Sequence, residues 1–118
     1  MIYIKINETF YPASINGRLV DRDWDDRDSK SIDIEMDYTT AISLFVNGLS
    51  WSIVMQNEVP VYNEEGLQVG VEIVEEEYDN SEYNLAGDIT DHRDGTITVK
   101  MGKLTPLEEA YELMFGGN

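Results

Sequence analysis

Apolar and acidic residues alternate along residues 31–36, where isoleucine or methionine occupies every second position. This period of two is typical of a β-strand with one buried face and one exposed face. The next segment changes to the helical spacing i, i+3, i+4 and i+7, which predicts a helix over residues 38–47. Gly48 is expected to end this helix in a left-handed cap, and residues 50–55 resume as a strand. The predicted buried stripe of the helix consists of Ile42, Phe45, Val46 and Leu49.

The chain before this unit also reads as strands. Residues 1–6 alternate and predict an opening strand, and Pro12, which lacks an amide hydrogen, predicts a sheet edge or a bend. A second strand is expected over residues 13–20, with a kink or tight turn at its Asn-Gly pair, residues 16–17. A loop rich in aspartate and arginine, residues 21–28, then leads into the first strand described above.

The middle of the chain has a weaker pattern. Residues 57–66 contain a proline and a turn signal, so we expect an irregular connection. Residues 67–73 alternate and predict a further strand. Residues 75–82 are mostly acidic with few apolar residues, and we expect a mobile, solvated strand end there. Consecutive glutamates on an extended chain point to opposite faces, so this stretch does not predict a carboxylate site.

A hairpin is predicted over residues 83–101, with its turn at residues 93–95. A three-residue loop with Gly95 in the left-handed region gives the better apolar face, because a two-residue loop would oppose His92 and Ile97. The predicted register pairs Ile89 with Val99 and Gly87 with Met101.

The chain closes with a helix that has a clear start signal. Thr105 is the expected N-cap, Pro106 occupies the first turn, and Glu108 completes a capping box. The glycines at residues 116–117 are expected to end it. The predicted buried stripe consists of Leu107, Ala110, Tyr111 and Met114.

These elements predict a single α+β domain spanning residues 1–118. The expected architecture is a curved, mainly antiparallel β-sheet, or a small open barrel or sandwich, covered by two short helices. With 118 residues, of which 42% are hydrophobic, the chain can bury a core of its own. The strand-like residues 1–6 do not resemble a signal peptide, and no apolar run is long enough to span a bilayer.

The chain is strongly acidic, with 24 Asp and Glu residues against 8 Lys and Arg residues and a formal net charge of −16. Such a surface repels the phosphates of nucleic acids and anionic membranes, so we expect no direct binding to either. It suits a basic protein partner, a cation, or a channel wall along which DNA slides. Solubility alone is the simpler explanation of the same charge.

The loop at residues 21–28 resembles a calcium-binding loop only in part. Asp21, Asp23 and Asp25 have the one-three-five spacing of such loops. Asp26, however, stands where the loop requires glycine, and Ile32 stands where it requires a bidentate glutamate. We therefore predict no metal site.

The sequence also lacks the residue patterns of an enzyme. There is no cysteine, no phosphate-binding glycine-rich loop and no pairing of a nucleophile with a base. His92 is the single histidine and lies next to a turn, far in sequence from any serine or carboxylate signature. We expect no catalytic residue, no cofactor and no enzymatic activity.

A small set of residues forms the candidate partner contacts. Trp24 lies within the charged loop and either folds back onto the core as a lid or anchors a partner, as tryptophan often does at interfaces. Two apolar residues fall beside the stripe of the last helix, where a partner surface or core overspill can explain them. The candidate contacts are Trp24, Arg22, Arg27, Leu113 and Phe115.

The hairpin with its Asp- and Arg-rich tip, followed by residues 29–36 and a short helix near residues 40–46, resembles small tail-module proteins of tailed bacteriophages and prophages. The resemblance covers about the first two-thirds of the chain and is one of pattern. It implies a non-enzymatic structural or assembly protein whose protein partners include copies of itself in a ring, with long loops that reach neighbours. It also implies a protein of the cytoplasm of a host bacterium, or of the virion.

A second hypothesis remains open. An acidic module of this kind can bind a basic protein, as an inhibitor, an immunity protein or a DNA mimic does. The negative charge agrees with both hypotheses and does not separate them.

Overall fold

The computed structural model describes residues 1–116, with side chains through Met114. Within these residues the chain forms seven strands, two short α-helices and one π-helical turn. In chain order they are β1 (Ile2–Ile6), β2 (Thr9–Asp21), β3 (Arg27–Glu35), α1 (Tyr38–Leu44), β4 (Ser52–Tyr62), β5 (Gln68–Asp79), β6 (Leu85–Asp91), β7 (Thr96–Gly102), α2 (Pro106–Tyr111) and η1 (Glu112–Gly116).

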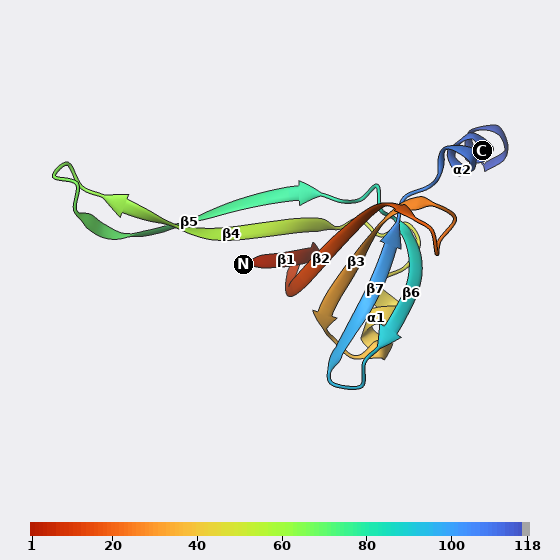
Figure 1. Ribbon diagram of the computed structural model, residues 1–118, viewed down its shortest axis with the longest axis horizontal. Helices are drawn as coiled ribbons and strands as arrows, with labels where there is room; N and C mark the ends of the chain where they lie inside the picture. Colours follow the sequence, from red (N-terminus) through yellow and green to blue (C-terminus); the bar gives the residue numbers. More distant parts are fainter. Residues whose placement is uncertain (117–118) are drawn as a thin grey trace.

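The strands form one open antiparallel sheet in the order β5-β4-β1-β2-β3-β7-β6 (Figure 1). The long strand β2 joins its two halves: it pairs with β1 up to Pro12 and with β3 from Ala13 onward. The proline, which cannot donate to a ladder, therefore lies where β2 changes partners. The predicted fold class, a mainly antiparallel α+β fold with two short helices, is confirmed as an open sheet.

The core lies between α1 and one face of the sheet. It is built from alternate residues of neighbouring strands, such as Ile32 opposite Val99 and Ile34 opposite Ile97. Trp51 is also buried, and its indole nitrogen donates a hydrogen bond to the carbonyl of Tyr83 at 2.9 Å. The buried cluster contains Ile4, Ile6, Ile32, Ile34, Ala41, Phe45, Trp51, Tyr83, Ile97, Val99 and Met101.

Helix α1 is shorter than predicted and turns a different face to the sheet. It ends at Leu44, and Ala41 and Phe45 are its buried contacts. Ile42 and Val46 are about half exposed, at 47% and 45%, so the predicted stripe is wrong at these two positions. The backbone leaves the helical conformation at Phe45, and the helical period no longer governs the residues after it.

The Asn-Gly pair at residues 16–17 forms no turn. Both residues lie inside β2, where Asn16 opposes Ser31 and Gly17 opposes Lys30. The prediction of a kink or tight turn is wrong because pairing with β3 holds this segment extended.

The middle of the chain is more regular than its sequence suggests. Residues 57–62 continue β4, so the predicted irregular connection is wrong there, whereas residues 75–79 form the exposed end of β5, the solvated strand end that the sequence predicts. Each glutamate of residues 75–77 opposes a residue of β4, which supplies backbone hydrogen bonds that composition does not reveal. The turn that joins β4 to β5 is as predicted: the side chain of Asn63 accepts two backbone hydrogen bonds, and Gly66 has φ of +82°.

The β6–β7 hairpin confirms half of its predicted register. Gly95 has φ of +90° and Ile89 opposes Val99, as expected. Met101, however, opposes Ala86 instead of Gly87, because the pairing shifts between Ala86 and Ile89. The ring of Trp24 lies against this irregular stretch: a Cβ atom on Gly87 would be 2.6 Å from it.

The start of α2 is as predicted, but its packing is not. Thr105 and Glu108 form both bonds of the capping box. Leu107, Tyr111 and Met114 are all well exposed, so the predicted buried stripe is wrong; α2 projects from the body of the molecule (Figure 1). The predicted end of the helix at Gly117 lies outside the described residues. Within residues 1–116, no helix has the length and apolar content needed to cross a bilayer.

Candidate interaction surfaces

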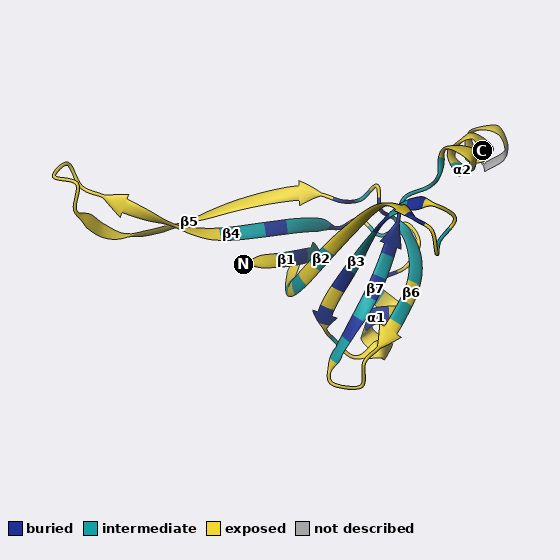
Figure 2. Cartoon of the chain, viewed as in Figure 1, coloured by how far each residue is buried: buried dark blue, intermediate teal, exposed yellow. Residues whose placement is uncertain are grey.

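The outer part of the β4–β5 hairpin, residues 57–74, extends far from the body, and we call it the arm (Figure 1). It accounts for much of the long dimension of a molecule that measures 64 × 36 × 27 Å. Every residue of the arm is exposed, and none belongs to the buried cluster (Figure 2). The arm therefore adds surface without adding to the core.

Both faces of the arm carry apolar side chains. Because residues opposite one another share a face, Val71 lies beside Pro60 and Ile73 lies beside Glu58. The other face carries Val59 opposite Glu72, with Val74 next to them. A single exposed apolar residue needs no explanation, but contiguous apolar residues on an extended hairpin are typical of a protein-binding surface. The exposed apolar residues are Val59, Val61, Tyr62, Leu67, Val69, Val71, Ile73 and Val74.

The arm and its base are also anionic, since no lysine or arginine occurs between Lys30 and Arg93. Two described cations reach this hairpin near its base. Lys5 forms an ion pair with Glu77 at 3.2 Å, which raises the pKa of Lys5, and the Met1 amino group donates to the carbonyl of Gln56 at 2.7 Å. The acidic residues of β4, β5 and their turn are Glu58, Glu64, Glu65, Glu72, Glu75, Glu76, Glu77 and Asp79.

Among the candidate contacts predicted from sequence, Trp24 takes the lid arrangement. It is half-buried and packs against Gly87 and Gly102, with the guanidinium of Arg27 at 4.9 Å from its ring. Arg22, in the same loop, is exposed. Trp24 thus closes one end of the β6–β7 pair, where the lack of side chains on two glycines makes room for its ring.

Arg27 is engaged within the chain. It is 3% exposed, and its two terminal nitrogens donate to the two carboxylate oxygens of Glu108 at 2.6 and 3.0 Å. One of them also donates to the carbonyl of Lys103 at 3.2 Å. The bonds from Arg27 are the main reason that the pKa of Glu108 falls to about 2. This pair fastens α2 to the tip of the β2–β3 hairpin and leaves little of Arg27 for a partner.

A second internal contact involves Asp21, which the sequence placed in a calcium-like loop. Its carboxylate is fully buried and accepts hydrogen bonds from Lys100 at 2.8 Å and Ser29 at 2.9 Å. The bond from Lys100 is the first cause of its lowered pKa. Within residues 1–116, no three acidic or histidine side chains are arranged to hold a metal ion. The pairing of Asp21 with Lys100 could not be read from the sequence, because it joins residues that are 79 positions apart.

Leu113 lies on the second exposed apolar surface, which is formed by α2 and the turn after it. It is 86% exposed, and Leu107 and Met114 are similarly open. The side chain of Phe115 lies outside the described residues. Sequence reasoning did find this surface, although it also expected a buried stripe beside it.

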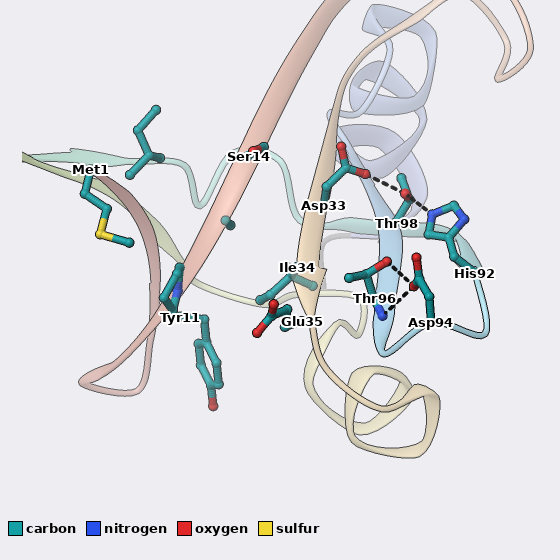
Figure 3. Close-up of a pocket in the computed structure, with 13 residues that line it drawn as sticks. Met1, Tyr11, Ser14, Asp33, Ile34, Glu35, His92, Asp94, Thr96 and Thr98 are labelled. Carbon is teal, nitrogen blue, oxygen red and sulfur yellow. Dashed lines mark hydrogen bonds between the residues drawn. The ribbon is translucent and has the colours of Figure 1, made fainter.

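A shallow groove of about 970 Å³ lies on the polar face of the sheet (Figure 3). In it, the hydroxyl of Thr98 donates to Asp33 at 2.5 Å, and Nε2 of His92 lies 2.7 Å from the same hydroxyl oxygen. Because Thr98 has one hydroxyl proton and gives it to Asp33, Nε2 of His92 must be the donor in its own bond. In this arrangement Nε2 of His92 carries a proton, and the three residues form a hydrogen-bonded row.

Comparison with known protein families, curated proteins and solved structures finds no match to this chain. The function must therefore be inferred from the surfaces described above.

Proposed function

We propose that the protein is a non-enzymatic assembly protein that acts through protein–protein contacts, with the arm as its main docking element. One observation carries this proposal: residues 57–74 hold exposed apolar side chains on both faces of the arm and contribute no buried side chain to the core. Folding of the body does not account for these apolar residues, whereas burial against a partner does.

The proposed setting is the tail region of a phage or prophage, which the sequence resemblance implies. A long hairpin that leaves the body can reach an adjacent subunit in such an assembly. The arm and α2 also lie at different ends of the molecule (Figure 1). Two different patches that dock head to tail make a heterologous contact, which closes into a ring or continues as a filament.

Removal of the arm tests this proposal. In the variant, residues 58–73 are deleted and a two-residue Asn-Gly turn joins Asn57 to Val74, which oppose one another in the hairpin. Sedimentation and co-purification are measured with the proteins encoded by adjacent genes. We expect wild-type protein to bind at least one of them and the shortened variant to lose that binding.

The matched control is Leu19→Ser, which removes an exposed apolar side chain from β2 and leaves the arm intact. It should bind as the wild type does. Equal binding by the shortened variant and the wild type would refute a docking role for the arm.

The second candidate function is a binding module for one basic protein, such as an inhibitor or a DNA mimic. The observation in its favour is the absence of lysine and arginine from residues 31–92, a span that includes the whole arm. Contacts of this kind weaken strongly as salt rises, because the charges involved are screened. A complex with one basic protein that salt and duplex DNA both disrupt would favour this candidate over the tail assembly.

A further inference from the structure

We propose that the outer edge of β5 is a docking site for an extended, basic segment of a partner protein, which adds to the sheet as an extra strand. This inference rests on the proposed function and specifies how the arm and its base bind. In such strand addition, backbone hydrogen bonds provide the affinity and the side chains provide the selectivity.

The two edges of the sheet differ in how well they are protected. β6, at one edge, has a register shift between Ala86 and Ile89 and lies against α1. β5, at the other edge, pairs with β4 without a shift from Gly70 to Asp79. Its residues are all exposed, and it contains neither proline nor lysine. Edge strands usually carry a bulge, a proline or a lysine to prevent unwanted pairing; this part of β5 has none of these, and its acidic residues deter acidic strands but not basic ones.

The hydrogen bonds at the chain start reveal which backbone groups of β4 face β5. Gln56 donates its amide to the carbonyl of Met1 at 2.9 Å and accepts from the Met1 amino group at 2.7 Å. The backbone amide and carbonyl of Gln56 therefore point toward β1. Because these groups alternate in direction along a strand, those of Met55 and Asn57 point toward β5.

The same alternation identifies the free backbone groups of β5. Glu76 and Val74 oppose Met55 and Asn57, so they face β4. Asn80, which is also an even-numbered residue, follows the same alternation, since its backbone amide points toward the β4 side and donates to the carbonyl of Trp51 at 2.8 Å. The intervening residues must turn their amide and carbonyl groups to the open edge. They are Val71, Ile73, Glu75 and Glu77.

The side chains along this edge indicate what kind of strand fits. Toward the arm tip the residues are apolar, at Val71 and Ile73, and toward the base they are acidic, at Glu75 and Glu77. Lysine or arginine opposite the acidic end would pair across the strands, and apolar residues would pack at the other end. The complementary segment is therefore extended, with basic and apolar residues.

A second copy of β5 fits this edge poorly. Pairing of two β5 strands brings together two segments that each hold Glu72, Glu75, Glu76 and Glu77 and no lysine or arginine, so like charges gather along the pair, and in a register centred on Val74 they stand directly opposite one another. The net charge of −16 on each molecule adds to this repulsion. Charge thus selects a basic partner over self-pairing.

The test uses two synthetic ten-residue peptides with blocked ends. One alternates lysine and valine, and the other has the same sequence with the backbone amides of one central lysine and one central valine methylated, so that it keeps the charge and lacks a ladder donor whichever residues face β5. Binding to the full-length protein is measured by calorimetry at physiological salt. We expect the first peptide to bind at least tenfold more tightly than the second.

Two variants at one position separate backbone pairing from side-chain contact. Ile73→Pro removes an amide that faces the open edge, so the hairpin should stay folded by circular dichroism while binding of the Lys-Val peptide falls at least tenfold. Ile73→Thr keeps the amide and should bind within about threefold of the wild type, since it loses only part of one apolar contact.

Equal binding of the two peptides, or undiminished binding by a folded Ile73→Pro variant, would overturn strand docking. A wild-type homodimer that Ile73→Pro dissociates would overturn the basic partner in favour of a second copy. If the arm-deletion variant loses its natural partner while Ile73→Pro keeps it, the strand-docking inference is wrong and the proposed function stands. If the arm-deletion variant keeps every partner, the proposed function itself fails.

Discussion

The guanidinium of Arg27 and the carboxylate of Glu108, 81 positions apart in the chain, form a bidentate ion pair with N–O distances of 2.6 and 3.0 Å. The same carboxylate accepts the backbone amide of Thr105 at 2.9 Å and so completes the capping box of α2. One side chain therefore starts the helix and also fastens it to the β2–β3 hairpin.

We expect Glu108→Gln to destabilise the protein by about 1.5–3 kcal/mol, the usual worth of hydrogen bonds to a charged group. The substitution removes the charge that neutralises the buried Arg27 while keeping the size of the side chain. Urea unfolding followed by tryptophan fluorescence measures the effect. Glu109→Gln, in the same turn but without a bond to Arg27, should change stability by less than about 0.5 kcal/mol. Equal effects of the two substitutions would refute a specific role for this pair.

The same pair predicts how stability depends on acid. The pKa of Glu108 is lowered from 4.5 to about 2 by its bonds to Arg27. A lowered pKa in the folded state gives stability that is present above pH 4.5 and is lost as the pH falls from 4.5 to 2. We expect the unfolding free energy of Glu108→Gln to fall less steeply than that of the wild type in this window. Some slope should remain, because the pKa of buried Asp21 is also lowered, mainly by its hydrogen bond from Lys100.

Tyr83 predicts a separate loss of stability in alkali. Burial, together with a hydrogen bond to Asp28 at 2.9 Å, raises its pKa from 10 to about 12. A raised pKa gives stability that is present below pH 10 and is lost as the pH rises from 10 to 12. Chemical unfolding is measured at intervals of half a pH unit. Between pH 10 and 12 the unfolding free energy of Tyr83→Phe should fall less steeply than that of the wild type. Tyr62→Phe, at an exposed site on the arm, should leave the fall of the unfolding free energy in this pH range unchanged.

The packing of Trp24 predicts that Gly102→Ala is costly. A Cβ at Gly102 would lie 2.7 Å from the Trp24 ring and 2.8 Å from Cδ of Arg27, so both side chains would have to shift. We expect a loss on the order of 1–3 kcal/mol in urea unfolding, as for overpacked interiors. Gly17→Ala is the control, because a Cβ there meets nothing within 4 Å. A Gly102→Ala variant as stable as the control would show that Trp24 can move aside without loss.

Deletion of the arm should leave the body stable. Residues 57–74 are all exposed and contribute no side chain to the buried cluster. We therefore expect the variant that joins Asn57 to Val74 through Asn-Gly to melt within a few degrees of the wild type, which scanning calorimetry would measure. A large fall in melting temperature would mean that the arm supports the fold, and the reason for assigning it a binding role would be lost.

The sequence determined the features that depend on neighbours in the chain. The capping box of Thr105 and Glu108 was predictable, as were the left-handed conformations of Gly48 and Gly95, although Gly48 does not cap α1, which ends at Leu44. The pairing of Ile89 with Val99 follows from the length of the turn between them. In each case the controlling interaction spans a few residues, so local spacing and backbone preference are enough.

Tertiary structure alone decided which apolar faces are covered. The spacing of Leu107, Tyr111 and Met114 shows that α2 has an apolar side, but it does not show whether another element packs there; in the structure none of the three is buried. The same holds for Ile42 of α1. Periodicity records how side chains are distributed around an element, whereas burial depends on what the rest of the chain places opposite them.

The sheet order likewise decided the candidate functional surfaces. The bonds of Arg27 to Glu108 and of Asp21 to Lys100 join residues about eighty positions apart, and only the arrangement of the strands brings them together. The arm was not recognised as a regular hairpin because residues 57–62 have a weak strand signal of their own. They are held extended by pairing with residues 68–74, and such pairing leaves no mark on the sequence of residues 57–62 alone.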